Sequence, residues 1–390
     1  MKKLLVFLAV GALACAVSCK KDGQVEVRPI DKDAPEWMKD KSLPVPIEFG
    51  VSAVVSTTTK TDYSIEQDGL FGWDWFRYGV IALGGPLGEE EAHPSINGIE
   101  AKNVPTQMFQ DGTAGGYKTQ FVDDSSNPLT FYYPIKSDVN WTFYGYYVRN
   151  GAPRYTSADI TQTSHDFTIS GIEMGACDIL WAKAAATEYY GHTGYNADYV
   201  RAIMNQTNYM YLGSEWAPHL KFEHKTARFI FNVKAESAYA ESTMEEALVT
   251  IDDIKVSGLS LSTATLNIKT GALTPDVADN YGIKQVNRDE TTPFQPVYND
   301  GKGKRWGDPL FIFPTDLVHP DIQLVMTIKA FGNADFVYTQ KLKGLEVDDY
   351  CFKAGKSYIF NITIKSYEKI EINTEVQDWT DVPVEAIEIG

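Results

Sequence analysis

Residues 358–364 read Tyr358-Ile359-Phe360-Asn361-Ile362-Thr363-Ile364, with a bulky apolar side chain at every second position. Residues 322–328, Ile322-Gln323-Leu324-Val325-Met326-Thr327-Ile328, alternate in the same way. Successive side chains of a strand point to opposite faces, so each stretch presents one apolar face, as a half-buried antiparallel strand requires. The two stretches therefore predict a fold built on sheets.

Shorter runs of aromatic and β-branched residues precede them, separated by clusters of Gly, Pro, Asn or Asp. Helical patterning is weak, and only residues 197–204 and 237–248 predict helices of a few turns. Many short strands with turn signals between them indicate sandwiches or barrels and not a parallel sheet. Further strands are expected over residues 47–51, 79–83, 129–133, 141–148, 167–170 and 179–184.

The length of 390 residues favours two domains. A strong strand signal over 220–233 follows a loop-like region, which places the boundary near residues 213–218. Within this signal, Phe222 is out of phase with Ala227 and the residues after it, which predicts a bulge or bend between the two. We expect an all-β fold of two tandem β-sandwiches, an N-terminal domain over 46–215 and a C-terminal domain over 216–390.

The first residues predict export. A basic start, a short apolar run from Leu4 to Val17 and a small-residue exit indicate a secretory signal too short to span a membrane. The exit, Ala16-Val17-Ser18-Cys19, resembles a bacterial lipoprotein processing site, which predicts a signal peptide over 1–18 and lipidation of Cys19. A plain signal-peptidase site is the alternative, and Cys15 is a weaker rival because apolar residues follow it. Residues 19–45 are polar and rich in proline, which predicts a spacer.

Charge and motifs exclude several functions. The formal net charge of −17 makes nucleic acid and anionic membrane surfaces unlikely partners for the folded body. The sequence has no GxSxG, HExxH, P-loop or EF-hand pattern, so we expect neither an enzyme nor a cofactor. His219 and His224 are five residues apart and have no further ligand nearby, so we expect no metal site. A disulfide between Cys177 and Cys351 stays open.

Two aromatic clusters suggest an alternative function. The first, over residues 71–78, favours a core; the second is a set of tyrosines over 189–211, for which loop anchoring and exposure are nearly equal interpretations. Exposed aromatic rings stack on sugars or on partner proteins. The alternative is therefore a glycan-binding surface lipoprotein that uses rings such as Tyr189, Tyr190 and Trp75.

Three segments together resemble the fimbrillin family of Bacteroidales surface lipoproteins, in particular its minor-fimbrium-like branch. Their order and spacing carry the resemblance, which spans nearly the whole chain. They are Asp178–Ala182 with Leu220–Phe231, then Gly355–Ile364, and then Ile370–Trp379.

The resemblance implies two transthyretin-like β-sandwiches, an outer-membrane lipoprotein precursor and a role in fimbriae and cell adhesion. Family members are cut after the first strand, and the groove that this strand leaves is filled by a strand of another subunit. On this chain, the displaced strand is residues 46–55, with Ile47, Phe49 and Val51. The loop after it offers Lys60 to a trypsin-like protease, with Lys41 as the second choice. Arg28 is a poor site because Pro29 follows it, and a lysine in this loop departs from the arginine expected in the family.

The same resemblance assigns the donor strand to the C-terminal tail, which contains Val382, Val384, Ile387 and Ile389. Val382 and Val384 share one face of an extended chain, whereas Ile387 and Ile389 lie on the other. Only eleven residues follow Trp379, which leaves stalk, tip and anchor subunits open. The expected partners are other fimbrial subunits, the membrane through the lipid, and a host or bacterial surface receptor.

Overall fold

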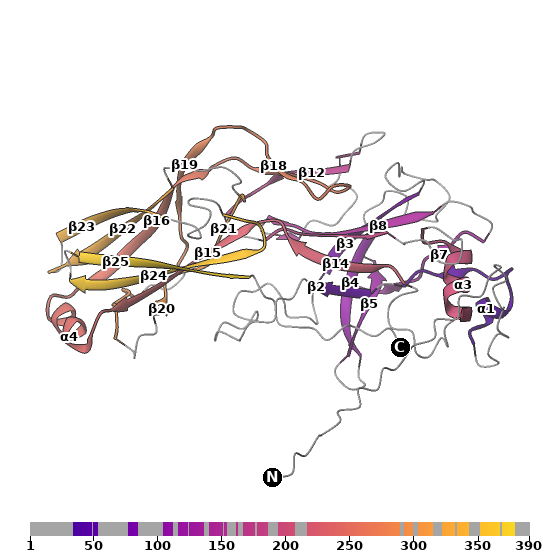
Figure 1. Ribbon diagram of the computed structural model, residues 1–390, viewed down its shortest axis with the longest axis horizontal. Coiled ribbons are helices and arrows are strands. Elements are labelled where there is room, and N and C mark those ends of the chain that lie inside the picture. Colours follow the sequence, from indigo (N-terminus) through magenta and orange to yellow (C-terminus); the bar gives the residue numbers. More distant parts are fainter. Residues whose placement is uncertain are drawn as a thin grey trace, which may run out of the picture.

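Strands dominate the computed structural model, and helices are few and short (Figure 1), as the alternating stretches predict. The predicted all-β sandwich class is confirmed. The structure describes residues 34–48, 50–53, 77–84, 104–111, 116–123, 125–135, 140–150, 152–153, 161–162, 167–175, 178–185, 194–206, 217–288, 292–298, 303–314, 322–331, 334–342, 352–366 and 369–378.

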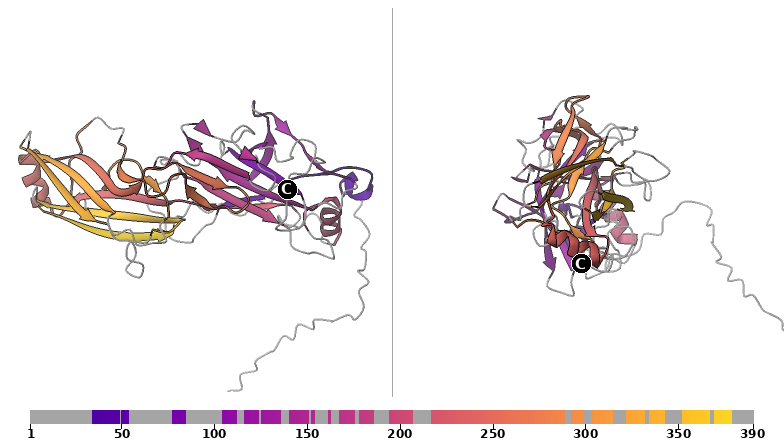
Figure 2. Two further views of the ribbon diagram at one scale, coloured as in Figure 1. Left: turned by 90° about the horizontal axis from the view of Figure 1, so that it is seen from above. Right: turned by 90° about the vertical axis from the view of Figure 1, so that its left-hand side faces the viewer.

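An eight-stranded sheet occupies one end of the elongated molecule (Figures 1 and 2). All of its neighbouring strands are antiparallel except the edge strand β2, which runs parallel to β14. The edge strand β2 also contacts β5, so the sheet curls over its own core. In spatial order its strands are β2 (Gly50–Ala53), β14 (His219–His224), β13 (Leu180–Ala185), β8 (Trp141–Tyr147), β3 (Arg77–Gly84), β4 (Val104–Asp111), β5 (Gly116–Val122) and β6 (Pro128–Leu129).

Strand β8 is buried on both faces. Trp141, Phe143 and Tyr147 lie in the core inside the curled sheet. Tyr144 and Tyr146 point the opposite way, into a second core that contains residues from both halves of the chain. A strand covered on both sides favours residues that tolerate burial at every position, which is why β8 has no charged residue and five aromatic ones among its seven.

A four-stranded sheet bridges the two halves of the molecule and covers the outer face of the eight-stranded sheet. Its central pair joins β12 to β17 from opposite sides of the predicted domain boundary. Gly171 adopts a left-handed φ of 68° at a bulge in β12, and its N–H donates to the Asp276 carboxylate at 3.3 Å. The strands are β11 (Thr161–Gln162), β12 (Phe167–Ile172), β17 (Ala264–Asn267) and β18 (Leu273–Pro275).

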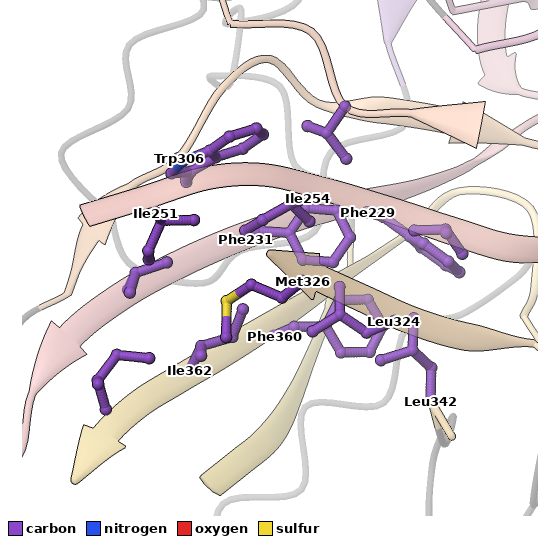
Figure 3. Packing of buried hydrophobic residues seen from close by; sticks show 14 of the residues in the cluster. Phe229, Phe231, Ile251, Ile254, Trp306, Leu324, Met326, Leu342, Phe360 and Ile362 are labelled. Atoms are coloured by element: carbon purple, nitrogen blue, oxygen red, sulfur yellow. The ribbon is translucent and has the colours of Figure 1, made fainter. Parts of the chain in front are cut away.

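Two further sheets pack face to face at the other end of the molecule and enclose a core of their own. Figure 3 shows Phe231 and Phe360 from one sheet against Ile254 and Met326 from the other. The Phe231 and Phe360 rings stack with centroids 5.3 Å apart. The first sheet contains β20 (Lys304–Arg305), β21 (Leu310–Ile312), β15 (Ala227–Ala235), β24 (Lys356–Ser366) and β25 (Lys369–Asp378); the second contains β19 (Tyr281–Gln285), β16 (Thr250–Ser260), β22 (Gln323–Ala330) and β23 (Ala334–Lys341).

Both predicted helices are present, as α3 (Ala197–Gln206) and α4 (Ala238–Glu246). Helix α4 begins after Ser237, whose hydroxyl accepts from the Ala240 N–H at 3.1 Å, the usual N-cap contact. Three small elements complete the described fold: helix α1 (Glu36–Lys39), the pair of β1 (Val45–Pro46) with β7 (Tyr132–Tyr133), and the pair of β9 (Arg149–Asn150) with β10 (Ala152–Pro153).

The bend predicted between Phe222 and Ala227 is a change of sheet. Strand β14 ends at His224 in the eight-stranded sheet, and β15 begins at Ala227 in the five-stranded sheet. The chain thus passes from one sheet to the other at residues 225–226, slightly after the predicted boundary at 213–218. The division into domains 46–215 and 216–390 remains a proposal, because the bridging sheet joins strands from both sides.

Residues 34–45 differ from the predicted spacer. Ala34 and Met38 are only 3% and 6% exposed and belong to the core of the eight-stranded sheet, and Met38 is the buried residue of α1. Prolines at the ends of this stretch suggest a loose linker from sequence, but they also permit a folded turn. Here the burial of the apolar side chains holds the stretch in a folded form.

Candidate functional site

The first strand is held at two places. Strand β1 pairs antiparallel with β7, and β2 pairs in parallel with β14, where Val51 is the partner of Leu220. Sequence predicts one strand over 46–55, whereas the structure has two short ones, and Ile47 lies between them. Phe49 lies outside the described residues.

The first strand supplies part of the core. Val45 and Ile47 are 0% and 4% exposed, and they join Met38 in the apolar cluster inside the curled sheet. The Ile47 N–H donates to the Phe131 carbonyl at 2.8 Å, beside the pairing of β1 with β7. Burial of each such side chain contributes about 2 kcal/mol. Loss of this segment would therefore open an apolar groove.

Strand β14, called the seat of β2 because β2 pairs with it, is firmly packed. In β14, Leu220 and Phe222 are 0% and 2% exposed. A Cβ on Gly145 of β8 would lie 2.8 Å from the tip of the Phe222 ring, so the ring packs directly on the β8 backbone. Strand β14 also pairs with β13 on its other side. It would thus remain in place, as a new sheet edge, if β2 left.

Two of the tyrosines in the second aromatic cluster are core residues. Tyr195 and Tyr199 are 7% and 4% exposed, and their rings meet edge to face with centroids 5.5 Å apart. Burial raises the pKa of Tyr195 well above its ordinary value. These two rings do not offer a surface for sugars. Tyr189, Tyr190, Tyr209, Tyr211 and Trp75 lie outside the described residues.

A buried polar cluster sits where the chain changes sheets. The Asp178 carboxylate lies 2.5 Å from Nδ1 of His224 and accepts from the Thr226 hydroxyl at 2.7 Å. It also accepts from the Ile179 N–H at 2.7 Å. The Thr226 carbonyl in turn accepts from the Gly355 N–H at 2.9 Å. Residues from Asp178–Ala182, Leu220–Phe231 and Gly355–Ile364 therefore meet at this joint.

Trp181 fastens the bridging sheet to the same joint. Its indole N–H donates to the Ile268 carbonyl at 2.7 Å, and Nζ of Lys225 lies 5.0 Å from the ring centre. Gly271, with a φ of 68°, lies so close that a Cβ there would be 2.6 Å from the ring. Asp178, Trp181 and Thr226 belong to the segments that carry the family resemblance, but sequence does not predict their contacts, because no spacing rule pairs residues 46 to 87 positions apart.

The fimbrillin-like family model matches residues 95–379, well over half of the chain, and this range includes the whole joint. The chain belongs to the fimbrillin-like family. A search of curated proteins finds no match.

Solved structures are similar to this fimbrillin-like chain over most of its length. A candidate cell adhesion protein of Bacteroides uniformis is 15% identical, with a TM-score of 0.51 over 86% of this chain and 98% of that one. A fimbrial protein of Bacteroides vulgatus is 14% identical, with a TM-score of 0.47 over 86% and 99% of the two chains. At such low identity, the first of these likenesses shows a shared fold.

The histidine pair of this fimbrillin-like chain lies on one strand. His219 and His224 are the first and last residues of β14, and His224 turns toward Asp178. Burial, with a smaller effect of Lys221, lowers the pKa of His219. Within the described ranges, no group of three or more metal-binding side chains gathers, and no helix is long and apolar enough to cross a membrane.

The modification sites of this fimbrillin-like chain stay predictions. Cys19, Lys60, Cys177, Cys351 and the tail residues Val382, Val384, Ile387 and Ile389 lie outside the described residues. Lys41 is described and exposed. Its neighbour Ser42 donates from both N–H and hydroxyl to the Asp40 carboxylate, at 2.8 and 2.6 Å, in a tight turn. A protease that binds extended chain would first have to open this turn, so the geometry disfavours a cut at Lys41.

Proposed function

We propose that the chain is a non-enzymatic fimbrial subunit that serves cell adhesion and assembles by strand exchange. Membership of the fimbrillin-like family supports the fimbrial role. The leader supports export as an outer-membrane lipoprotein anchored through Cys19, followed by transfer into an extracellular fimbria. Other subunits are the main partners, and the receptor is a host or bacterial surface molecule.

The observation that carries this proposal is the position of β2. It is an edge strand that meets the sheet through one short parallel ladder, from Gly50 with His219 to Ala53 with Phe222. Among the described strands β2 is hydrogen-bonded on one side only, so fewer backbone bonds hold it than hold an inner strand of the sheet. Its departure would expose the edge of β14 together with the groove left by Val45 and Ile47.

A cut after β2 makes this departure productive. In the intact chain, the loop after β2 keeps the strand at a high local concentration, so it rebinds at once. Cleavage at Lys60 ends this tethering. An incoming strand then gains backbone hydrogen bonds along β14 and fills the groove with its side chains.

The proposed donor is the C-terminal tail of another copy, with Val382 and Val384 facing one way and Ile387 and Ile389 the other. The tail and the groove are different surfaces of one chain. Head-to-tail contacts of this kind extend into a filament when the rotation between successive subunits does not close a ring.

A disulfide lock tests the proposal. In unlipidated protein with Cys177 and Cys351 replaced by serine, Ser52→Cys with Lys221→Cys joins β2 to its partner position in β14. The matched control, Asn232→Cys with Asn361→Cys, joins another parallel pair, β15 with β24. Each protein is cut with limited trypsin and analysed on an unheated detergent gel, with and without reductant.

We expect the cut control to form detergent-resistant multimers under both conditions. The cut β2 lock should remain monomeric until reductant releases the strand. Multimers formed by the oxidised lock would contradict strand exchange at this site. Monomers in all cut samples would remove the support for a polymerising subunit.

A further inference from the structure

Residues 37–43 are held against the body by one buried arginine. Arg201 is 7% exposed and stands on α3, which Figure 1 shows beside α1. Its Nε donates to the Trp37 carbonyl at 3.1 Å. Its Nη2 donates to the carbonyls of Leu43 at 2.6 Å and Lys41 at 3.4 Å. One guanidinium thus holds three backbone carbonyls of the segment that leads into β1.

The support of this arginine is rigid. The opposite face of α3 buries Val200 and Ile203 in the core of the curled sheet. The helix begins after Asn196, whose side chain accepts from the Tyr199 N–H at 2.8 Å and donates to Asn140 at 2.7 Å. Movement of the held segment therefore has to break its bonds to Arg201, because α3 itself is fixed.

The Arg201 guanidinium donates to three backbone carbonyls, and the carboxylates of Asp198 and Asp40 also act on its charge. The Asp198 carboxylate lies 3.8 Å from Nη1 of Arg201 and is largely exposed. A buried guanidinium is costly unless its N–H groups are paired. After departure of the segment, the same group would face water and be hydrated. This contact thus retains the segment before the cut without penalising the open groove afterwards, unlike an apolar contact.

We propose that Arg201 is a positioning residue that controls the release of the first strand after cleavage. This inference rests on the proposed function, since release matters only if the strand is exchanged. The three contacts of Arg201 with backbone carbonyls, called the clamp, act on both parts of the leaving segment. The clamp holds residues 37–43 directly, and through them it keeps Val45 and Ile47 next to their partners.

The test follows release itself and not assembly. The unlipidated chain carries a recognition sequence for a site-specific protease in place of residues 56–62. Four proteins are compared: the parent, Arg201→Lys, which keeps the charge but loses the planar fork, Arg201→Met, which keeps much of the apolar volume, and Arg228→Lys. In Arg228→Lys, an arginine that donates to Ser357 at 2.8 Å in the other half of the molecule is changed in the same way.

Two quantities are measured at a protein concentration low enough to keep the chain monomeric. The first is amide exchange of Met38, Asp40, Leu43 and Ile47, whose N–H groups are all hydrogen-bonded. The second is the rate at which the N-terminal fragment separates from the body after cleavage. Loss of charge-assisted hydrogen bonds should speed both by about 10- to 100-fold in the two Arg201 variants. Exchange in β24 should be unchanged, which shows that the variants are folded.

Unchanged fragment release in a folded Arg201 variant would overturn the proposal, as would an equal acceleration in Arg228→Lys. Release is read without any second subunit, so the two proposals fail separately. Rapid release without multimers would leave the clamp standing and count against strand exchange only.

Discussion

The Asp178 carboxylate and the His224 imidazole lie 2.5 Å apart inside the joint where the chain passes from the eight-stranded to the five-stranded sheet. Asp178 precedes β13, and His224 ends β14, so their contact ties neighbouring strands together at the point where one of them leaves the sheet. Thr226 adds a bond from just beyond the crossing. The cluster fixes the position of β14, which is also the seat of β2.

Asp178→Asn should destabilise the protein by about 3 kcal/mol, because the amide keeps one acceptor oxygen but turns an NH2 donor toward the buried partner of the second carboxylate oxygen. Chemical denaturation of the unlipidated protein measures the loss. Glu246→Gln, an exposed change at the end of α4, is the control and should stay within about 0.5 kcal/mol of the parent. Equal stability of the two variants would contradict a structural role for the cluster.

Gly271→Ala and Gly171→Ala separate backbone strain from side-chain contact. Both glycines have a φ of 68°, but a Cβ at Gly271 meets Trp181 at 2.6 Å, whereas a Cβ at Gly171 meets nothing within 4 Å. Both variants should lose about 1 kcal/mol for the backbone, and Gly271→Ala should lose at least about 1 kcal/mol more. Thermal unfolding and tryptophan fluorescence measure the difference; equal losses would contradict close packing on Trp181.

Alternation along the chain was enough to predict the strands, because period-two patterning is local. Ile322–Ile328 and Tyr358–Ile364 lie within β22 and β24 as predicted, apart from the first residue of the former. The out-of-phase Phe222 also predicts a feature of the structure, the passage of the chain from the eight-stranded to the five-stranded sheet. Local patterns carry no information on long-range partners, however. Sequence therefore gave no sign that Arg201 would reach Leu43, or that Asp178 would meet His224.

Mild acid should weaken the seat of β2. Burial holds the pKa of His219 below its ordinary value of about 6.5, so the folded state disfavours the charged ring. Stability is then unaffected above about pH 6.5 and falls as the pH drops below it, by at most about 1.4 kcal/mol per unit. His219→Gln should flatten this slope. Identical pH profiles of unfolding for parent and variant would contradict the assignment.

Lys60→Gln should prevent assembly after limited trypsin treatment, because the tether of the first strand then stays intact. Lys41→Gln should not, because the Ser42 N–H is bonded to Asp40 and the Lys41 carbonyl to Arg201, so this peptide bond is not offered as extended chain. The intact mass after digestion identifies the cut, and the unheated gel reports multimers. Assembly of Lys60→Gln at the parental rate would reject Lys60 as the processing site.

The central claim is that a strand from another copy replaces β2 on β14, and a mixed disulfide tests it most directly. One cut protein carries Lys221→Cys, at the position opposite Ser52 of β2, as its only cysteine. A second cut protein carries a single cysteine, moved in turn through residues 382–389. The account predicts a disulfide between the two chains, found by mass spectrometry at positions on one face of the tail, and only after the protein that carries Lys221→Cys is cut. No such disulfide at any tail position, or an equal yield from uncut proteins, would contradict it.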